Sequence, residues 1–221
     1  MASDRMAPFG RRRGSGERAT LRNILVGGMR RLAAAVMALL VLTGPNAAVG
    51  LNVFEAELGE LARTQLQEIA RSPVVIDAVR AQNLVTSSYS ETMITSLDRE
   101  WAEETDGDYG RPLIDATLAR DVSRYLSTIQ EGSEGLFTEI ILMDASGLNV
   151  GISRVTSDYW QGDEDKWKMT FLVGPESLHI GPLEEDLSTR TVQSQVSLPV
   201  VDPDTGKVIG ALTFGIDVEE L

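Results

Sequence analysis

The spacing of apolar residues changes character near the middle of the chain. From Val53 to Ala70 they recur every three to five positions between Glu and Arg residues, which is the period of an amphipathic helix. Similar patterns cover about 74–82, 87–104 and 112–130, and Ser72-Pro73 supplies an N-cap and a first helical residue before the first of these. The first half of the chain is therefore predicted to be helical.

The second half reads as strands. Residues 137–143 are β-rich and end in the turn Asp144-Ala-Ser-Gly147, after which 149–154 returns as the second strand of a hairpin. A short helix and three more strands are expected at about 164–171, 179–181, 190–200 and 208–217. Helices followed by an antiparallel sheet predict an α+β fold and not a doubly wound one.

Charge divides the chain at about residue 50. Residues 1–50 carry eight Arg against Asp4 and Glu17, a balance of +6, so that the net charge of −13 leaves −19 for residues 51–221. A domain this acidic repels phosphate backbones, which argues against nucleic-acid binding. The length of residues 51–221 is that of a single domain with one core.

The basic N-terminus surrounds an apolar run at residues 32–43, which follows a pair of arginines and precedes small residues up to Gly50. This is the order of a secretory signal peptide, with cleavage near Gly50 and a periplasmic mature protein. Twelve residues are short of the roughly 20 that span a bilayer. The alternative is an uncleaved anchor that tethers the domain to the inner membrane, facing the periplasm. Translation can start at Met1 or at Met29.

Three segments of the chain, 69–79, 137–147 and 149–167, resemble the Cache superfamily of extracytoplasmic sensor domains (PDC, PAS-like), in its single-domain proteobacterial type. The third is the most specific, because a hairpin there leads through Thr-Ser-Asp-Tyr-Trp and an acidic turn into a Trp-bearing helix. The resemblance covers 51–221. It implies a five-stranded antiparallel sheet with a long N-terminal helix packed on one face and a ligand cavity over the other.

The segment between Ser153 and Phe171 combines two Trp and a Tyr with several charged residues. Rings beside a few polar groups are typical of a small-molecule pocket, because the rings supply apolar contact and the polar groups fix orientation. The alternative is a loop whose two Trp plug one end of the sheet. The predicted ligand-binding residues are Arg154, Asp158, Tyr159, Trp160, Asp163 and Trp167.

The chemistry of the ligand is open at this point. Arg154 can pair bidentately with a carboxylate or form a surface salt bridge. Cache domains that hold amino acids resemble one another in an Arg two residues before the helix Trp, where this chain has Asp165. That departure disfavours amino acids by this route and favours a cationic or amine-bearing ligand, or no contact. The acidic run 163–165 lacks the spacing of a calcium loop and fits a solvated turn better.

Catalytic chemistry is not indicated. The chain has no Cys, and His179 is its one histidine, read here as a strand residue, so a zinc site lacks ligands. No serine lies in a Gly-x-Ser-x-Gly turn. We therefore expect no enzyme activity, no metal and no cofactor.

The sequence thus predicts an extracytoplasmic module that senses a small molecule, has no output domain of its own and signals through a partner protein. The alternatives are a structural or protein-interaction domain with a self-filled cavity, or a fragment of a longer transmembrane receptor. The amphipathic face of the 53–70 helix is also compatible with a homodimer.

Overall fold

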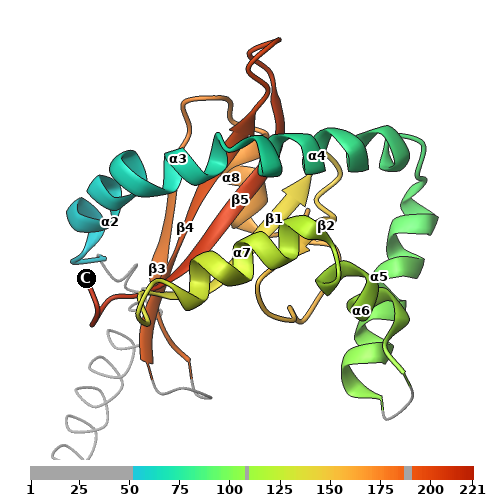
Figure 1. Ribbon diagram of the computed structural model, residues 1–221, viewed down its shortest axis with the longest axis horizontal. Coiled ribbons are helices and arrows are strands. Elements are labelled where there is room, and N and C mark those ends of the chain that lie inside the picture. The colour runs from blue at the N-terminus through green and yellow to red at the C-terminus, as the bar shows by residue number, and fades with distance from the viewer. Residues whose placement is uncertain (1–51, 108–109, 187–190) are drawn as a thin grey trace, which may run out of the picture. The chain divides into compact units, whose positions relative to one another are not determined.

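The computed structural model describes residues 52–107, 110–186 and 191–221 (Figure 1). Its helical elements are α2 (Glu55–Leu61), the π-helix η1 (Ala62–Leu66), α3 (Gln67–Ala70), α4 (Pro73–Thr86), α5 (Glu91–Asp106), α6 (Pro112–Leu118), α7 (Asp121–Glu131) and α8 (Asp165–Phe171). Its strands are β1 (Phe137–Asp144), β2 (Asn149–Ile152), β3 (His179–Asp186), β4 (Thr191–Val201) and β5 (Val208–Asp217).

The five strands of the described residues form one sheet in the order β2-β1-β5-β4-β3, and all neighbours are antiparallel. Two tight turns fix its register. Gly147 between β1 and β2 has φ 80° and Gly206 between β4 and β5 has φ 68°, a region that side chains with a Cβ rarely occupy. Both turns were expected from the sequence.

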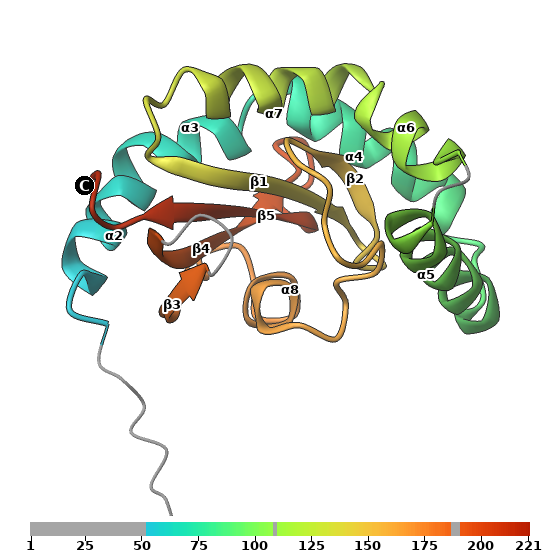
Figure 2. The same cartoon turned by 90° about the horizontal axis from the view of Figure 1, so that it is seen from below.

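One face of the sheet is covered by the continuous helical segment α2-η1-α3, by α4 and by α7 (Figure 2). Leu58 and Leu66 from the N-terminal helix meet Ile140, Leu142 and Phe214 of the sheet in one cluster, and all five are fully buried. The three-to-five spacing of apolar residues therefore marks the buried side of this helix.

The opposite face carries α8 (Figure 2), and its buried side chains form one cluster with residues of α5 and α6, which lie beyond the β2 edge of the sheet. Ile141 and Met143 alternate with the β1 residues of the first cluster and join Trp101 of α5 and Trp167 of α8 in a second one. Burial on both faces explains why β1 is a continuous apolar run and does not alternate with polar residues.

The predicted α+β class is confirmed, with a long N-terminal helix on a five-stranded antiparallel sheet within the described residues. One element was wrong: the single helix expected at 112–130 is two helices. Arg120 breaks it with extended backbone (φ −67°, ψ 147°). Its Nη1 donates to the carbonyl oxygens of Val150 (2.7 Å) and Asn149 (3.1 Å), so a tertiary contact holds the bend.

Several boundaries also differ: the helix expected at 74–82 continues to Thr86, and the strand expected at 149–154 ends at Ile152. The helix expected from residue 87 begins at Glu91, because Ser90 is the N-cap and accepts from the Met93 N–H at 3.3 Å. The strand expected at 179–181 continues to Asp186, because it pairs with β4 beyond Gly181 after a shift in register. Short apolar patterns alone do not reveal such pairing.

The predicted leader, residues 1–50, lies outside the described residues, so its cleavage and the start at Met1 or Met29 stay predictions. Among the described helices, none combines the length and apolarity that crossing a membrane requires.

Candidate functional site

The stretch Ser153–Phe171, here called the capping segment, contains all six predicted ligand-binding residues. Its first anchor is Asp98 of α5, whose Oδ1 accepts from the backbone N–H groups of Tyr159 (3.0 Å) and Trp160 (2.9 Å). The Tyr159 ring stacks on Trp101 with centroids 5.2 Å apart. Burial raises the pKa of the Tyr159 hydroxyl above its ordinary value, and the positive charge of Arg120 opposes that rise.

Both Trp side chains of the capping segment use their indole N–H inside the protein. Trp160 donates to the carbonyl of Ser146 at 2.9 Å, and Trp167 donates to the carbonyl of Asp144 at 3.0 Å. Trp167 is 9 % exposed and stacks on Phe171 with centroids 4.7 Å apart. This placement corresponds to the plug alternative, in which rings close one end of the sheet.

Asp158 and Arg154 lie apart from these rings. The Asp158 carbonyl accepts from Thr156 Oγ1 (2.7 Å), Gln161 Nε2 (2.7 Å) and Asn149 Nδ2 (3.0 Å), which ties the loop together. Arg154 is exposed, donates to the Thr138 carbonyl at 3.3 Å and borders a hollow of about 200 Å³. The six predicted residues are therefore spread over different parts of the segment, and their contact with a ligand stays a prediction.

A larger hollow of about 380 Å³, here called the acidic pocket, lies where the start of α8 faces β3 and β4. Asp163 is the predicted site residue that lines it. The other polar side chains around it are Glu164, Asp165, Lys166, His179, Glu184 and Gln195. Four residues with carboxylate side chains thus line one hollow, three from the capping segment and one from the edge of the sheet.

Little positive charge balances these carboxylates. Lys166 is 7 % exposed and its Nζ lies 3.0 Å from Glu164 Oε2, which is the one ion pair of the pocket within the described residues. His179 adds little, because burial lowers the pKa of its imidazole below the ordinary value, an effect that Asp165 only partly opposes. Near neutral pH the pocket therefore holds four carboxylates against one ammonium group.

The acidic pocket can hold a ligand through its charge and its hydrogen-bond acceptors. Within the described residues no group of three or more His, Cys, Asp or Glu side chains is close enough to hold a metal ion. What remains is a negatively charged hollow with a neutral imidazole and the Gln195 amide, groups that accept hydrogen bonds from an ammonium or amidinium group.

Sequence reasoning found the acidic run of this pocket but missed its other wall. His179 is the first residue of β3, as its interpretation as a strand residue required, yet it also lines the pocket with Glu184 and Gln195. The strand order brings β3 and β4 to the edge beside α8, and no local pattern signals that order. The hint available in the sequence was the presence of His179 and Gln195 in the two strand patterns at 179–181 and 190–200.

No protein-family model matches the chain, and no curated protein matches it either. Solved structures do. The sensor domain of the Vibrio cholerae histidine kinase DctB is 14 % identical over 76 % of this chain and 58 % of its own, with a TM-score of 0.34.

Two chemoreceptor ligand-binding domains match similarly. That of Campylobacter jejuni Tlp3, in complex with 4-methylisoleucine, is 15 % identical over 73 % of this chain and 64 % of its own, with a TM-score of 0.36. That of Pseudomonas aeruginosa PctC, in complex with GABA, is 16 % identical over 75 % and 62 %, with a TM-score of 0.33. The chain thus spans less than two thirds of each. All three are sensor or ligand-binding domains, the class of protein that the sequence resembles.

Proposed function

We propose that this protein is an extracytoplasmic ligand-sensing module that binds a small cationic or amine-bearing molecule in its acidic pocket. It binds without catalysing a reaction, and it passes the signal to a partner protein or to a further part of a longer receptor. The observation that carries the proposal is that four carboxylate residues line one hollow, where the ion pair of Lys166 with Glu164 is the one found within the described residues of the pocket.

The physical argument is one of charge relief. Asp163 and Glu184 are exposed, come from different elements and have no cationic partner within the described part of the chain. Like charges that face one hollow repel, and a bound ammonium group converts that repulsion into charge-assisted hydrogen bonds. The volume of about 380 Å³ lies within the range of small-molecule pockets, which begins at roughly 300 Å³.

The location outside the cytoplasm rests on the predicted leader in residues 1–50, whether it is cleaved or retained as an anchor. An exported domain that binds small amines without reacting with them suits the role of a detector. A sensing module of this kind needs a second contact to relay occupancy, so signalling through a partner belongs to the same proposal.

A second candidate is a structural domain whose own rings fill the cavity expected from the resemblance. It is favoured by the satisfied indole N–H groups of Trp160 and Trp167, which donate to the carbonyls of Ser146 and Asp144. In that case the rings hold the sheet and α5 together, and no small molecule is required.

A thermal-shift series on the purified protein separates the two. The probes are butane-1,4-diamine, butane-1,4-diol and butanedioate, which share a four-carbon chain and differ in charge. We expect the diamine alone to raise the melting temperature; a ligand at 100 times its Kd adds about 2.7 kcal/mol to the folded state. No shift with the diamine, or equal shifts with all three probes, contradicts the proposal.

The matched variants are Glu184→Gln and Glu185→Gln. Both residues are exposed neighbours on β3, but only Glu184 lines the acidic pocket. We expect Glu184→Gln to reduce the shift caused by the diamine and Glu185→Gln to leave it unchanged. Equal responses of the two variants would show that overall negative charge, and not this pocket, attracts the diamine.

A further inference from the structure

On the helix-covered face of the sheet lies a groove of about 510 Å³ between α4 and α7, larger than the acidic pocket. Figure 1 shows the two helices crossing this face side by side. The groove, here called the α4–α7 groove, is lined by Ala78, Ala81, Val122, Val150, Gln82 and Arg120, among others. Its walls are mainly short apolar side chains, with polar groups gathered at the end where α7 begins.

We propose that the α4–α7 groove is a second binding site, which takes a small aliphatic carboxylate. Its carboxylate pairs with the Arg120 guanidinium, and its hydrocarbon chain lies on Ala78 and Ala81. This site is separate from the acidic pocket and prefers the opposite charge, so the inference goes beyond the proposed function.

The first argument is the hydrogen bonding of the Arg120 guanidinium. Its Nη1 donates to Gln82 Oε1 (2.7 Å), the Val150 carbonyl (2.7 Å) and the Asn149 carbonyl (3.1 Å), and the guanidinium also forms a side-chain hydrogen bond with Tyr159. Nε and Nη2 donate to no carboxylate or backbone oxygen among the described residues. The side chain is thus held in place by neutral oxygen acceptors, and none of these hydrogen bonds cancels its positive charge.

The second argument is charge. No carboxylate of the described residues lies within ion-pair distance of Arg120, although the chain carries a net charge of −13. The buried carboxylate of Asp144 bonds to Gln82 Nε2 (3.0 Å) and Thr86 Oγ1 (2.8 Å) instead. The Tyr159 hydroxyl beside Arg120 stays neutral because burial raises its pKa. A half-buried guanidinium without a carboxylate partner favours an anion.

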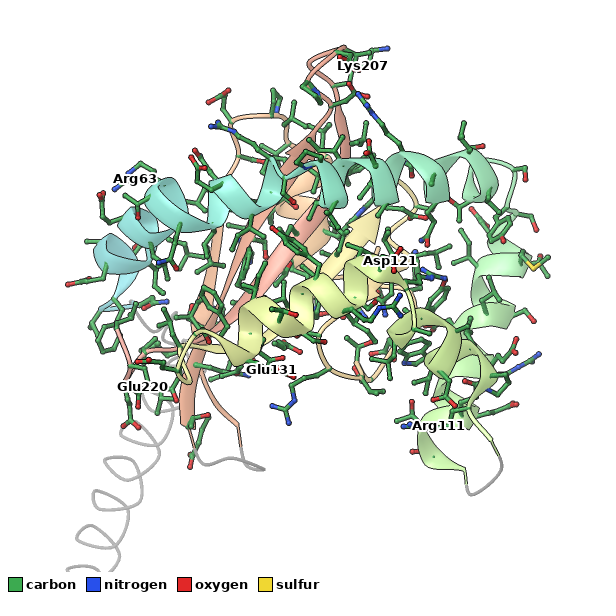
Figure 3. The ribbon with its side chains drawn as sticks, viewed as in Figure 1. Arg63, Arg111, Asp121, Glu131, Lys207 and Glu220 are labelled. Atoms are coloured by element: carbon green, nitrogen blue, oxygen red, sulfur yellow. The ribbon has the colours of Figure 1, made fainter. Side chains whose placement is uncertain are left out.

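The third argument comes from the start of α7. Arg120 is the N-cap residue of this eleven-residue helix, and no side chain caps it. The helix dipole at this end of the groove favours negative charge. Asp121 stands at this end as well (Figure 3), but its side chain is 92 % exposed and pairs with Arg124.

Calorimetric titration of the full protein with hexanoate tests the inference, with hexylamine and 1-hexanol as probes of equal chain length. We expect hexanoate to bind and 1-hexanol to bind at least about tenfold more weakly, as the loss of a charge-assisted hydrogen bond implies. Hexylamine reports on the acidic pocket. Absence of hexanoate binding at about 10 mM, where a millimolar site is largely occupied, overturns the inference.

Three variants locate the site. Arg120→Gln should weaken hexanoate binding about tenfold or more. Because Arg120 also supports β2, Ala81→Phe provides an independent test: Ala81 is exposed, so a ring there fills the groove without disturbing the core. Asp121→Asn should tighten binding about two- to fivefold, since it removes a like charge from the rim.

The control is Arg99→Gln, which removes an arginine of α5 that is 73 % exposed and lies outside the groove. We expect it to leave the hexanoate affinity unchanged. Hexanoate binding that is equal in the wild type and in Ala81→Phe places the ligand elsewhere and refutes the inference. Because hexylamine and the diamine probe a different pocket, their failure to bind would refute the proposed function alone.

Discussion

The capping segment contains two groups of residues that differ in whether their polar groups find partners inside the protein. Tyr159, Trp160 and Trp167 are here called the ring half, and Asp163–Asp165 the acidic half. In the ring half, the indole N–H groups of Trp160 and Trp167 both donate to backbone carbonyls, and Tyr159 stacks on Trp101. In the acidic half, Asp163 faces a hollow without a cationic partner among the described residues. Satisfied groups stabilise the fold, whereas unsatisfied groups remain available to a ligand. Residue type alone does not separate the two.

The largest expected effect on stability follows from removing a ring of the ring half. Trp167→Ala should lower the free energy of unfolding by about 3–5 kcal/mol, because it removes a buried ring and leaves the Asp144 carbonyl without its indole donor. Urea unfolding monitored by circular dichroism measures this loss. Met169→Ala, exposed on the same helix, is the control and should change stability by less than about 0.5 kcal/mol. A small loss in the Trp167 variant would mean that its ring is not a core element.

The next largest effect concerns Asp144, whose backbone carbonyl accepts the indole N–H of Trp167 in the ring half. Asp144 is fully buried, and its Oδ1 accepts from the N–H groups of Ser146 (2.8 Å) and Leu148 (2.9 Å). Asp144→Asn replaces one accepting oxygen with a donor and should cost about 1–3 kcal/mol of unfolding free energy. Chemical denaturation at neutral pH provides the value. Unchanged stability would show that these bonds do not hold the β1–β2 turn.

Outside the capping segment, the ion pair of Arg80 with Asp202 shows how a partnered carboxylate makes stability depend on pH. Arg80 bonds Asp202 at 3.0 and 2.7 Å and lowers the pKa of that carboxyl from 3.8 to about 2. Because the folded-state pKa is depressed, the stabilisation is present above the ordinary pKa and is lost as pH falls through about 2. We expect Asp202→Asn to be less stable than the wild type at pH 7.

The free energies of unfolding of the wild type and of Asp202→Asn should converge as the pH is lowered from about 4 toward 2. Unfolding curves at several pH values test this. The control is Asp204→Asn, because the Asp204 side chain is 76 % exposed and its bond to Arg80 is screened by water. A stability difference for Asp202→Asn that persists unchanged at low pH would contradict the assigned ion pair.

The smallest effect on stability belongs to the acidic half. Neutralising Asp163 and Glu184 together, as Asn and Gln, should change the free energy of unfolding by less than about 0.5 kcal/mol, because neither side chain has an ion-pair partner among the described residues. The same double variant should lose most of the thermal shift caused by butane-1,4-diamine. Strong destabilisation would show that these carboxylates hold the fold and are not a binding surface.

Much of the fold could be predicted from local signals. The period of apolar residues marked the N-terminal helix, Ser72 proved to be the N-cap of α4, and the glycines at 147 and 206 marked the two turns. The break at Arg120 could not be predicted in the same way. Residues 112–130 are compatible with one helix, and the contact that bends them comes from β2.

The candidate site was predicted less completely, for a physical reason. Aromatic residues such as Trp160 and Trp167 suit a pocket and a core equally well, and their partners at Ser146 and Asp144 depend on tertiary structure. The acidic run at 163–165 was visible in the sequence. Its opposite wall required the order of strands at the sheet edge, which brings Glu184 to face that run.

The central claim is that a small amine occupies the acidic pocket and not the ring cluster. Titration of the isotopically labelled protein with butane-1,4-diamine, followed by heteronuclear NMR, tests it most directly. We predict shifts in the Gly181 amide and the Gln195 side-chain amide, while the indole N–H signals of Trp160 and Trp167 stay in place. Shifts confined to the two indole signals, with those of Gly181 and Gln195 unchanged, would contradict the account.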